Sequence, residues 1–193
     1  MDKKDIILAG VGGQGILSIA TVIGWAALDQ NLHLKQAEVH GMSQRGGDVQ
    51  SNLRLSRERI WSDLIPKGGC DLILSLEPME ALRYLPWLAP DGWIVTNTTP
   101  FVNIPNYPEM ADIHKELASV GRVVSVDCDA IAKDVGSTKS ANMVLLGASA
   151  SVMEIIDPEK LREGIAEVFA RKGEKIVEMN IAAFNAGLEA SKK

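Results

Sequence analysis

Cysteine is scarce in this sequence, with only Cys70 and Cys128 among 193 residues. An iron–sulfur cluster takes about four cysteine thiolates, so the chain cannot hold one by itself. A disulfide framework is not indicated either, because such frameworks belong to short, thiol-rich secreted chains. No group of cysteine, histidine and acidic residues has the spacing of zinc ligands. The sequence therefore predicts no metal site on this chain.

An excess of positive charge and long apolar runs are also lacking. Lysine and arginine total 20 against 25 acidic residues, a net charge of −5, which argues against a general nucleic-acid or anionic-membrane binder. A local cationic pocket remains compatible with this balance. The longest apolar helical stretch, residues 16–28, contains Ser18, Thr21 and Gly24 and is too short to span a bilayer. With no signal-peptide pattern, we expect a cytoplasmic protein.

Apolar strands and helices alternate along the chain. We predict strands at residues 5–10, 32–40, 49–55, 70–76, 93–97 and 122–126, and helices at 14–29, 79–88, 110–120, 141–153, from 157 onward and at 174–189. This order predicts an α/β, Rossmann-like three-layer domain with a mostly parallel sheet and a helical C-terminal part. Because no repeat or linker divides the chain, we expect residues 1–193 to form a single domain.

Three smaller features receive structural interpretations. Glu77, Glu80 and Arg83 have helical spacing and predict a solvated helix start with an ion pair. Trp61 follows a charged stretch and is predicted to lie in a subunit interface. His40 has no visible nucleophile as a partner, so we expect no catalytic residue on this chain.

A glycine-rich run, GVGGQG at residues 10–15, lies between the first strand and the first helix. In such a GxGxxG run Gly10 allows a tight turn, Gly12 lets the backbone approach a phosphate, and Gly15 permits close packing of helix on strand. The helix N-terminus then favours an anion. A tight turn without a ligand is the alternative interpretation.

A dinucleotide enzyme would need an acidic residue about 20 residues beyond the glycines. Glu38, some 23 residues past Gly15, is the only acid near that place. This spacing disfavours NAD, but a free-standing NAD(P)- or flavin-binding Rossmann-type enzyme remains the alternative function. A non-catalytic nucleotide-binding regulator is a third possibility.

A second polar loop occupies residues 40–47, HGMSQRGG. Its guanidinium, on Arg45, stands beside two glycines and suits a phosphate or another oxyanion. Because the loop leaves the C-terminal end of the second strand, we expect it beside the first glycine loop, where open α/β sheets bind ligands. A turn with one surface arginine is the alternative.

The two loops together, GVGGQG and HGMSQRGGDVQSNLRL, resemble the gamma-type domain of 2-oxoacid:ferredoxin oxidoreductases. Within that family the second loop is most similar to the beta subunits of the indolepyruvate branch. Three further segments extend the resemblance over nearly the whole chain: DLILSLEPMEALRYLPWL at 71–88, SANMVLLGA at 140–148 and NIAAFNAGL at 180–188.

The resemblance implies an enzyme of two unlike subunits. The larger partner would carry thiamine diphosphate with magnesium and the iron–sulfur clusters. The complex would oxidatively decarboxylate an aryl pyruvate with coenzyme A (CoA), giving an arylacetyl-CoA, carbon dioxide and reduced ferredoxin. This chain has neither a GDG…NN thiamine signature nor a CxxCxxC cluster motif, so it would be inactive alone.

The resemblance also implies a CoA site on this chain. Its glycine loop would meet the pyrophosphate or pantetheine, Arg45 would pair a phosphate or help close the subunit interface, and Asn142 would hydrogen-bond ligand or partner. Some relatives have a lysine after the glycine turn, where this chain has Ser18 and Ile19. The residues expected at the site are Gly10, Gly12, Gly13, Gln14, Gly15, Ser43, Gln44, Arg45, Gly46, Gly47 and Asn142.

Overall fold

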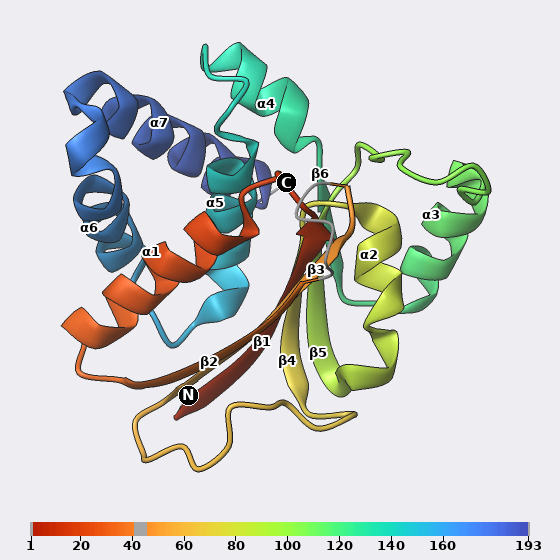
Figure 1. Cartoon of the computed structure of the whole chain (residues 1–193), viewed down its shortest axis with the longest axis horizontal. Helices are drawn as coiled ribbons and strands as arrows, with labels where there is room; N and C mark the ends of the chain where they lie inside the picture. Colours follow the sequence, from red (N-terminus) through yellow and green to blue (C-terminus); the bar gives the residue numbers. More distant parts are fainter. Residues whose placement is uncertain (1, 41–45, 193) are drawn as a thin grey trace.

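The computed structural model describes residues 2–40 and 46–192 of the chain. A six-stranded sheet forms its centre, with the strand order β2-β3-β1-β4-β5-β6 (Figure 1). The strands are β1 (Lys3–Val11), β2 (His33–His40), β3 (Asp48–Ser56), β4 (Cys70–Ser75), β5 (Leu88–Asn97) and β6 (Val123–Val126). The pairings of β1 with β4, β4 with β5 and β5 with β6 are parallel, whereas β3 runs against both β1 and β2. The predicted mostly parallel sheet is confirmed.

Helices cover both faces of the sheet, which confirms the predicted three-layer α/β fold. They are α1 (Ile16–Asp29), α2 (Pro78–Arg83), α3 (Met110–Ser119), α4 (Cys128–Asp134), α5 (Ala141–Met153), α6 (Pro158–Phe169) and α7 (Glu174–Ala190). Figure 1 shows α1, α5, α6 and α7 on one side of the sheet and α2 and α3 on the other. In the described part of the chain, no helix combines the length and apolar character needed to cross a membrane.

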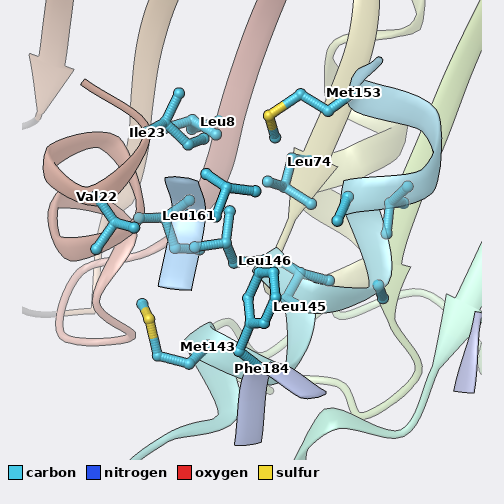
Figure 2. Packing of buried hydrophobic residues seen from close by; sticks show 14 of the residues in the cluster. Leu8, Val22, Ile23, Leu74, Met143, Leu145, Leu146, Met153, Leu161 and Phe184 are labelled. Carbon is cyan, nitrogen blue, oxygen red and sulfur yellow. The ribbon is translucent and has the colours of Figure 1, made fainter. Parts of the chain in front are cut away.

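The central strand β1 is buried on both faces. Ile6 and Leu8 point into the larger core, under α1 and α5, while Ile7 and Ala9 point into the smaller core, under α2 and α3. The sequence of a strand that is buried on both faces is a continuous apolar run. This pattern is why residues 5–10 could be predicted as a strand. Figure 2 shows the larger core, where Leu8 and Leu74 from the sheet meet side chains of α1, α5, α6 and α7.

Helices α5 and α7 contact each other through glycine. A Cβ atom on Gly147 would overlap the carbonyl oxygen of Phe184, and one on Gly187 would overlap that of Val144. Eleven of the residues of α5 are buried, as its apolar sequence predicts. Phe184 of α7 is also fully buried, so the last helix packs on the domain.

Three expectations need correction. The helix predicted over 79–88 ends at Arg83, and a 3-10 turn (Leu85–Trp87) leads directly into β5 because Pro86 interrupts the helical pattern. Helix α4 was not predicted. Glu77 and Glu80 are 0% and 1% exposed rather than solvated, although the predicted ion pair between Glu80 and Arg83 is present at 2.7 Å.

Candidate functional site

The glycine loop connects Val11, the last residue of β1, to Ile16, the first residue of α1. Gly15 occupies the N-cap position of α1 with φ +90° and provides no capping side chain. The backbone N–H groups of Gly13, Gly15, Ile16 and Leu17 donate to none of the described residues. These donors and the helix dipole make the loop suitable for an anion.

Gln14 holds the loop in shape. Its side-chain oxygen accepts a hydrogen bond from the Val11 N–H at 2.7 Å, and its side-chain nitrogen donates to the Leu76 carbonyl at 3.1 Å. The Leu76 carbonyl follows β4, so Gln14 ties the ends of two neighbouring strands together. The Gln14 side chain therefore positions the loop, and the residue also lines two of the hollows described below.

The second loop joins the first through backbone hydrogen bonds. The Gly12 N–H donates to the Gly47 carbonyl at 2.8 Å, and the Gly46 N–H donates to the Gly12 carbonyl at 3.4 Å. The predicted proximity of the two loops is confirmed for these residues. Ser43, Gln44 and Arg45, also predicted site residues, lie outside the described residues.

Asn142 is 7% exposed and lies at the start of α5. Its side-chain nitrogen donates to the Gly15 carbonyl at 3.3 Å, and its side-chain oxygen accepts from the Met143 N–H at 3.0 Å. The close contact that requires glycine at position 15 is therefore with Asn142 of α5, rather than with a strand as the motif predicted. A Cβ atom on Gly10 would lie 2.9 Å from the Gln14 side-chain oxygen and 3.1 Å from the Ile16 side chain.

Polar side chains from neighbouring strand ends complete this edge of the sheet. Asn97, the last residue of β5, donates to Asp129 at 2.8 Å and accepts from the Cys128 N–H at 3.0 Å. The loop after β1 runs into α1 on one face of the sheet, and the chain after β4 runs into α2 on the other face. The glycine loop thus lies at a topological switch point, where α/β sheets bind ligands.

Three adjoining hollows surround the loop, and Gly13 lines all of them. An apolar one of about 420 Å³ lies between Ile16, Leu17 and Val49. The other two, each of about 450 Å³, share Thr138, Lys139 and Asn142. Sequence reasoning missed Thr138 and Lys139, although the polar stretch GSTKS before an apolar helix could have drawn attention to them.

The structure gives no support for a dinucleotide site built on Glu38. This residue lies on β2, which is separated from β1 by the antiparallel strand β3. In a dinucleotide-binding fold the acidic residue would end the strand next to the glycine loop. Glu38 instead accepts a hydrogen bond from Gln36 of its own strand.

Neither cysteine is suited to chemistry. Cys70 and Cys128 are fully buried, and burial raises the pKa of the Cys70 thiol to about 12 and raises that of Cys128 as well. Both thiols therefore stay protonated at neutral pH and are poor nucleophiles and ligands. Within residues 2–40 and 46–192, no three histidine, cysteine or acidic side chains gather as a metal site.

Fold and loops together define a Rossmann-like α/β domain whose glycine loop presents backbone donors to an anion. The chain belongs to the pyruvate ferredoxin/flavodoxin oxidoreductase family, whose sequence model matches residues 5–190. The resemblance noted from the two loops is thereby confirmed. Membership of this oxidoreductase family is therefore favoured over the alternative function of a free-standing dinucleotide-binding enzyme.

Two relatives in the family match the chain over nearly their full length. The chain is 34% identical to indolepyruvate oxidoreductase subunit IorB of Thermococcus kodakarensis, with 100% of this chain and 98% of that protein covered. It is 36% identical to the IorB subunit of Archaeoglobus fulgidus, with 96% and 94% covered. A solved structure of 2-oxoglutarate:ferredoxin oxidoreductase from Magnetococcus marinus, with 2-oxoglutarate, coenzyme A and succinyl-CoA bound, shares the fold. Its TM-score is 0.77 at 22% identity, covering 100% of this chain and 31% of that chain.

Proposed function

We propose that this chain is the non-thiamine subunit of an indolepyruvate:ferredoxin oxidoreductase. The complex would convert an aryl pyruvate and CoA into an arylacetyl-CoA and carbon dioxide, with reduction of ferredoxin. In this proposal residues 1–193 act as a single gamma-type domain that contributes the CoA site and a subunit interface in a cytoplasmic enzyme. Support for the substrate comes from the IorB relatives, which match over nearly their full length.

One observation carries the CoA assignment: the hydrogen bonds between Gly12 and the Gly46–Gly47 segment, which place both family loops at one sheet edge. Neutral backbone N–H donors at the start of α1 suit a diphosphate, which is an anion spread over several oxygens. The apolar hollow beside Ile16, Leu17 and Val49 suits the less polar pantetheine arm. CoA bound to the related oxidoreductase of Magnetococcus marinus supports the same ligand here.

The remaining chemistry belongs to the partner in this proposal. Thiamine diphosphate supplies carbanion stabilisation when bound, and iron–sulfur clusters carry electrons. Our chain would orient CoA, exclude water from its reactive end and hold the loops in place through Gln14 and Asn142. Trp61 is 78% exposed, in keeping with its predicted place in a subunit interface.

A reconstitution experiment tests this function. The chain is co-expressed with a large subunit that carries thiamine and iron–sulfur motifs, purified without oxygen, and assayed for viologen-dye reduction. We expect dye reduction that needs both subunits, CoA and indolepyruvate, with pyruvate and 2-oxoglutarate as poorer substrates. The separate subunits are the control. A chain that fails to associate and instead binds NAD(P) alone would refute the assignment.

A further inference from the structure

One of the hollows beside the glycine loop extends to the C-terminal helices. It has a volume of about 450 Å³ and lies between the loop, the segment 136–140 before α5, and the start of α7. Its lining combines lysine and hydroxyl side chains with the apolar side chains of Phe169, Ile176 and Met179. A ligand that fits this mixed lining carries an anionic group next to a flat or apolar one.

Two lysines from different segments of the chain line the cavity. Lys139 comes from the segment before α5, and Lys172 ends the 3-10 turn after α6. Neither ammonium group forms an ion pair with any described residue. The Nζ of Lys172 lies 5.0 Å from the centre of the Phe169 ring, which keeps the charge at the cavity wall. Two such cations in a chain of net charge −5 suit a doubly charged anion.

The apolar side chains of the lining lie with one polar side chain that offers a free acceptor in the described part of the chain. Asn180 is only 5% exposed and lines the cavity. Its side-chain nitrogen donates to the Ile176 carbonyl at 2.7 Å, while its side-chain oxygen accepts from none of the described residues. An amide oxygen at an apolar wall suits the exocyclic amino group of an adenine ring.

We propose that this cavity binds the adenosine end of the ligand and that Lys139 and Lys172 bind its ribose phosphomonoester. The inference rests on the proposed function and deepens it, because CoA carries a 3′-phosphate next to its adenine. A phosphomonoester dianion calls for full positive charges, whereas the diphosphate is met by the neutral N–H donors of the glycine loop. NADP shares the same chemistry through its 2′-phosphate.

Binding measurements on the complex with the large subunit test the proposal by titration calorimetry. The ligands are CoA, dephospho-CoA, which lacks the 3′-phosphate, and NADP. We expect the wild type to bind CoA about 10–100-fold more tightly than dephospho-CoA. A Lys139→Ala/Lys172→Ala double variant should bind CoA and dephospho-CoA alike. Lys175→Ala, which removes a neighbouring exposed charge outside the cavity, should keep the wild-type preference.

The possible failures are distinguishable. If the wild type binds CoA and dephospho-CoA equally, or the double variant keeps the preference, the lysine assignment is wrong while CoA binding by the subunit stands. If CoA does not bind at all, or NADP binds more tightly than CoA, the proposed function fails together with this inference. Because the ligand comparison in the wild type needs no substitution, a folding defect in a variant cannot obscure the result.

Discussion

The side-chain nitrogen of Asn142 donates a hydrogen bond to the carbonyl oxygen of Gly15 at 3.3 Å, joining the start of α5 to the start of α1. A Cβ atom at position 15 would lie 2.6 Å from that same nitrogen, and the backbone there has φ +90°. Each residue therefore restricts what the other position can hold. The shape of the glycine loop depends on a contact between segments 127 residues apart in the sequence.

This relationship predicts a coupled response in a double-mutant cycle. Gly15→Ala should lower the free energy of unfolding by about 2–3 kcal/mol, because backbone strain adds to the clash with Asn142. In an Asn142→Ala background the clash is gone, so the same change should cost only about 1–2 kcal/mol of strain. Urea unfolding of the wild type, both single variants and the double variant measures the coupling. Additive effects would contradict the contact.

The glycine contact between α5 and α7 predicts a sharp difference between two helical glycines. Gly147→Ala should destabilise the protein by about 3 kcal/mol or more, because its Cβ would overlap the Phe184 carbonyl. Gly24→Ala in α1 is the matched control, since its Cβ would meet only a Leu34 methyl at 3.4 Å. Gly24→Ala should be neutral or stabilising by up to about 1 kcal/mol. Thermal unfolding of both variants shows which substitution is the more destabilising. Similar losses of stability in the two variants would refute the close contact between α5 and α7.

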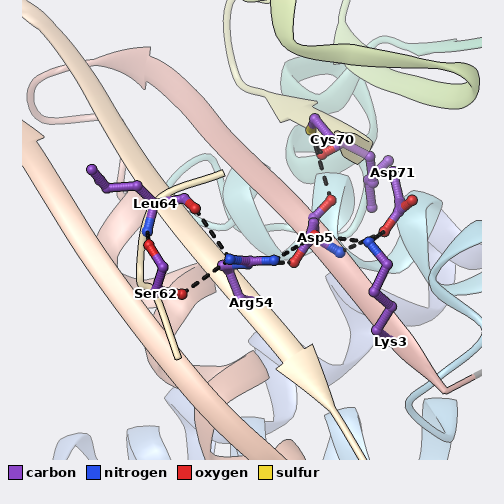
Figure 3. A network of polar contacts seen from close by, with 8 residues as sticks. Lys3, Asp5, Arg54, Ser62, Leu64, Cys70 and Asp71 are labelled. Atoms are coloured by element: carbon purple, nitrogen blue, oxygen red, sulfur yellow. Dashed lines mark hydrogen bonds and ion pairs between the residues drawn. The ribbon is translucent and has the colours of Figure 1, made fainter. Parts of the chain in front are cut away.

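A buried ion pair at the opposite end of β1 provides the third prediction. Arg54 binds both oxygens of Asp5, at 2.7 and 3.1 Å, and also donates to the carbonyls of Ser62 and Leu64 (Figure 3). Because the Asp5 side chain is only 3% exposed, Arg54→Ala should cost about 3 kcal/mol of stability. Arg57→Ala, which removes an exposed pair with Asp2 at 3.9 Å, should change stability by less than about 0.5 kcal/mol. Chemical denaturation measures both losses. Equal losses of stability in the two variants would contradict the stabilising role of the Arg54–Asp5 contacts.

The buried Cys70 thiol and Tyr84 hydroxyl predict a loss of stability at high pH. Burial raises the pKa of Cys70 from 9.0 to about 12 and that of Tyr84 from 10.0 to about 12. Both groups hold their protons more firmly in the folded state than in the unfolded state. Their contribution to the free energy of unfolding is therefore complete below about pH 9 and is lost as the pH rises toward 12. The urea midpoint, measured from neutral pH through this window, should fall, and Tyr84→Phe should reduce the slope. A midpoint independent of pH across the window would refute this account.

The sequence predicted most of the fold because its strands are buried on both faces or alternate regularly. Residues 5–10 and 70–76 lie in or overlap β1 and β4, and the alternating Leu53 and Leu55 of β3 face the larger core. Helix α4 was missed because it spans only Cys128–Asp134, too short for apolar periodicity. The side chain of Asp127 caps it by accepting from the Ala130 N–H at 2.9 Å, the signal that could have revealed it.

Other features depend on contacts that local patterns do not contain. Glu77 is buried because Tyr107 and the Phe101 N–H, 24 or more residues away, donate to its carboxylate. The insertion of β3 between β1 and β2 likewise depends on tertiary pairing. For the candidate site, the glycine motif indicated the loop, and the resemblance to the oxidoreductase family indicated Asn142. The convergence of Lys139 and Lys172 on one cavity came from the packing of α5, α6 and α7.

The most direct test of the central claim is the affinity of the complex for CoA when Gly13 is changed to alanine. Gly13 has φ +105° and lines all three hollows. Apart from its chain neighbours, no atom of the described residues lies within 4 Å of its Cβ position, so an added methyl group would occupy the space proposed for the ligand. Gly121→Ala, at φ +82° and equally open, imposes comparable backbone strain away from the site. We predict that Gly13→Ala weakens CoA binding at least about tenfold while Gly121→Ala leaves it unchanged. Equal CoA affinity in the wild type and both variants would contradict a CoA site on this loop.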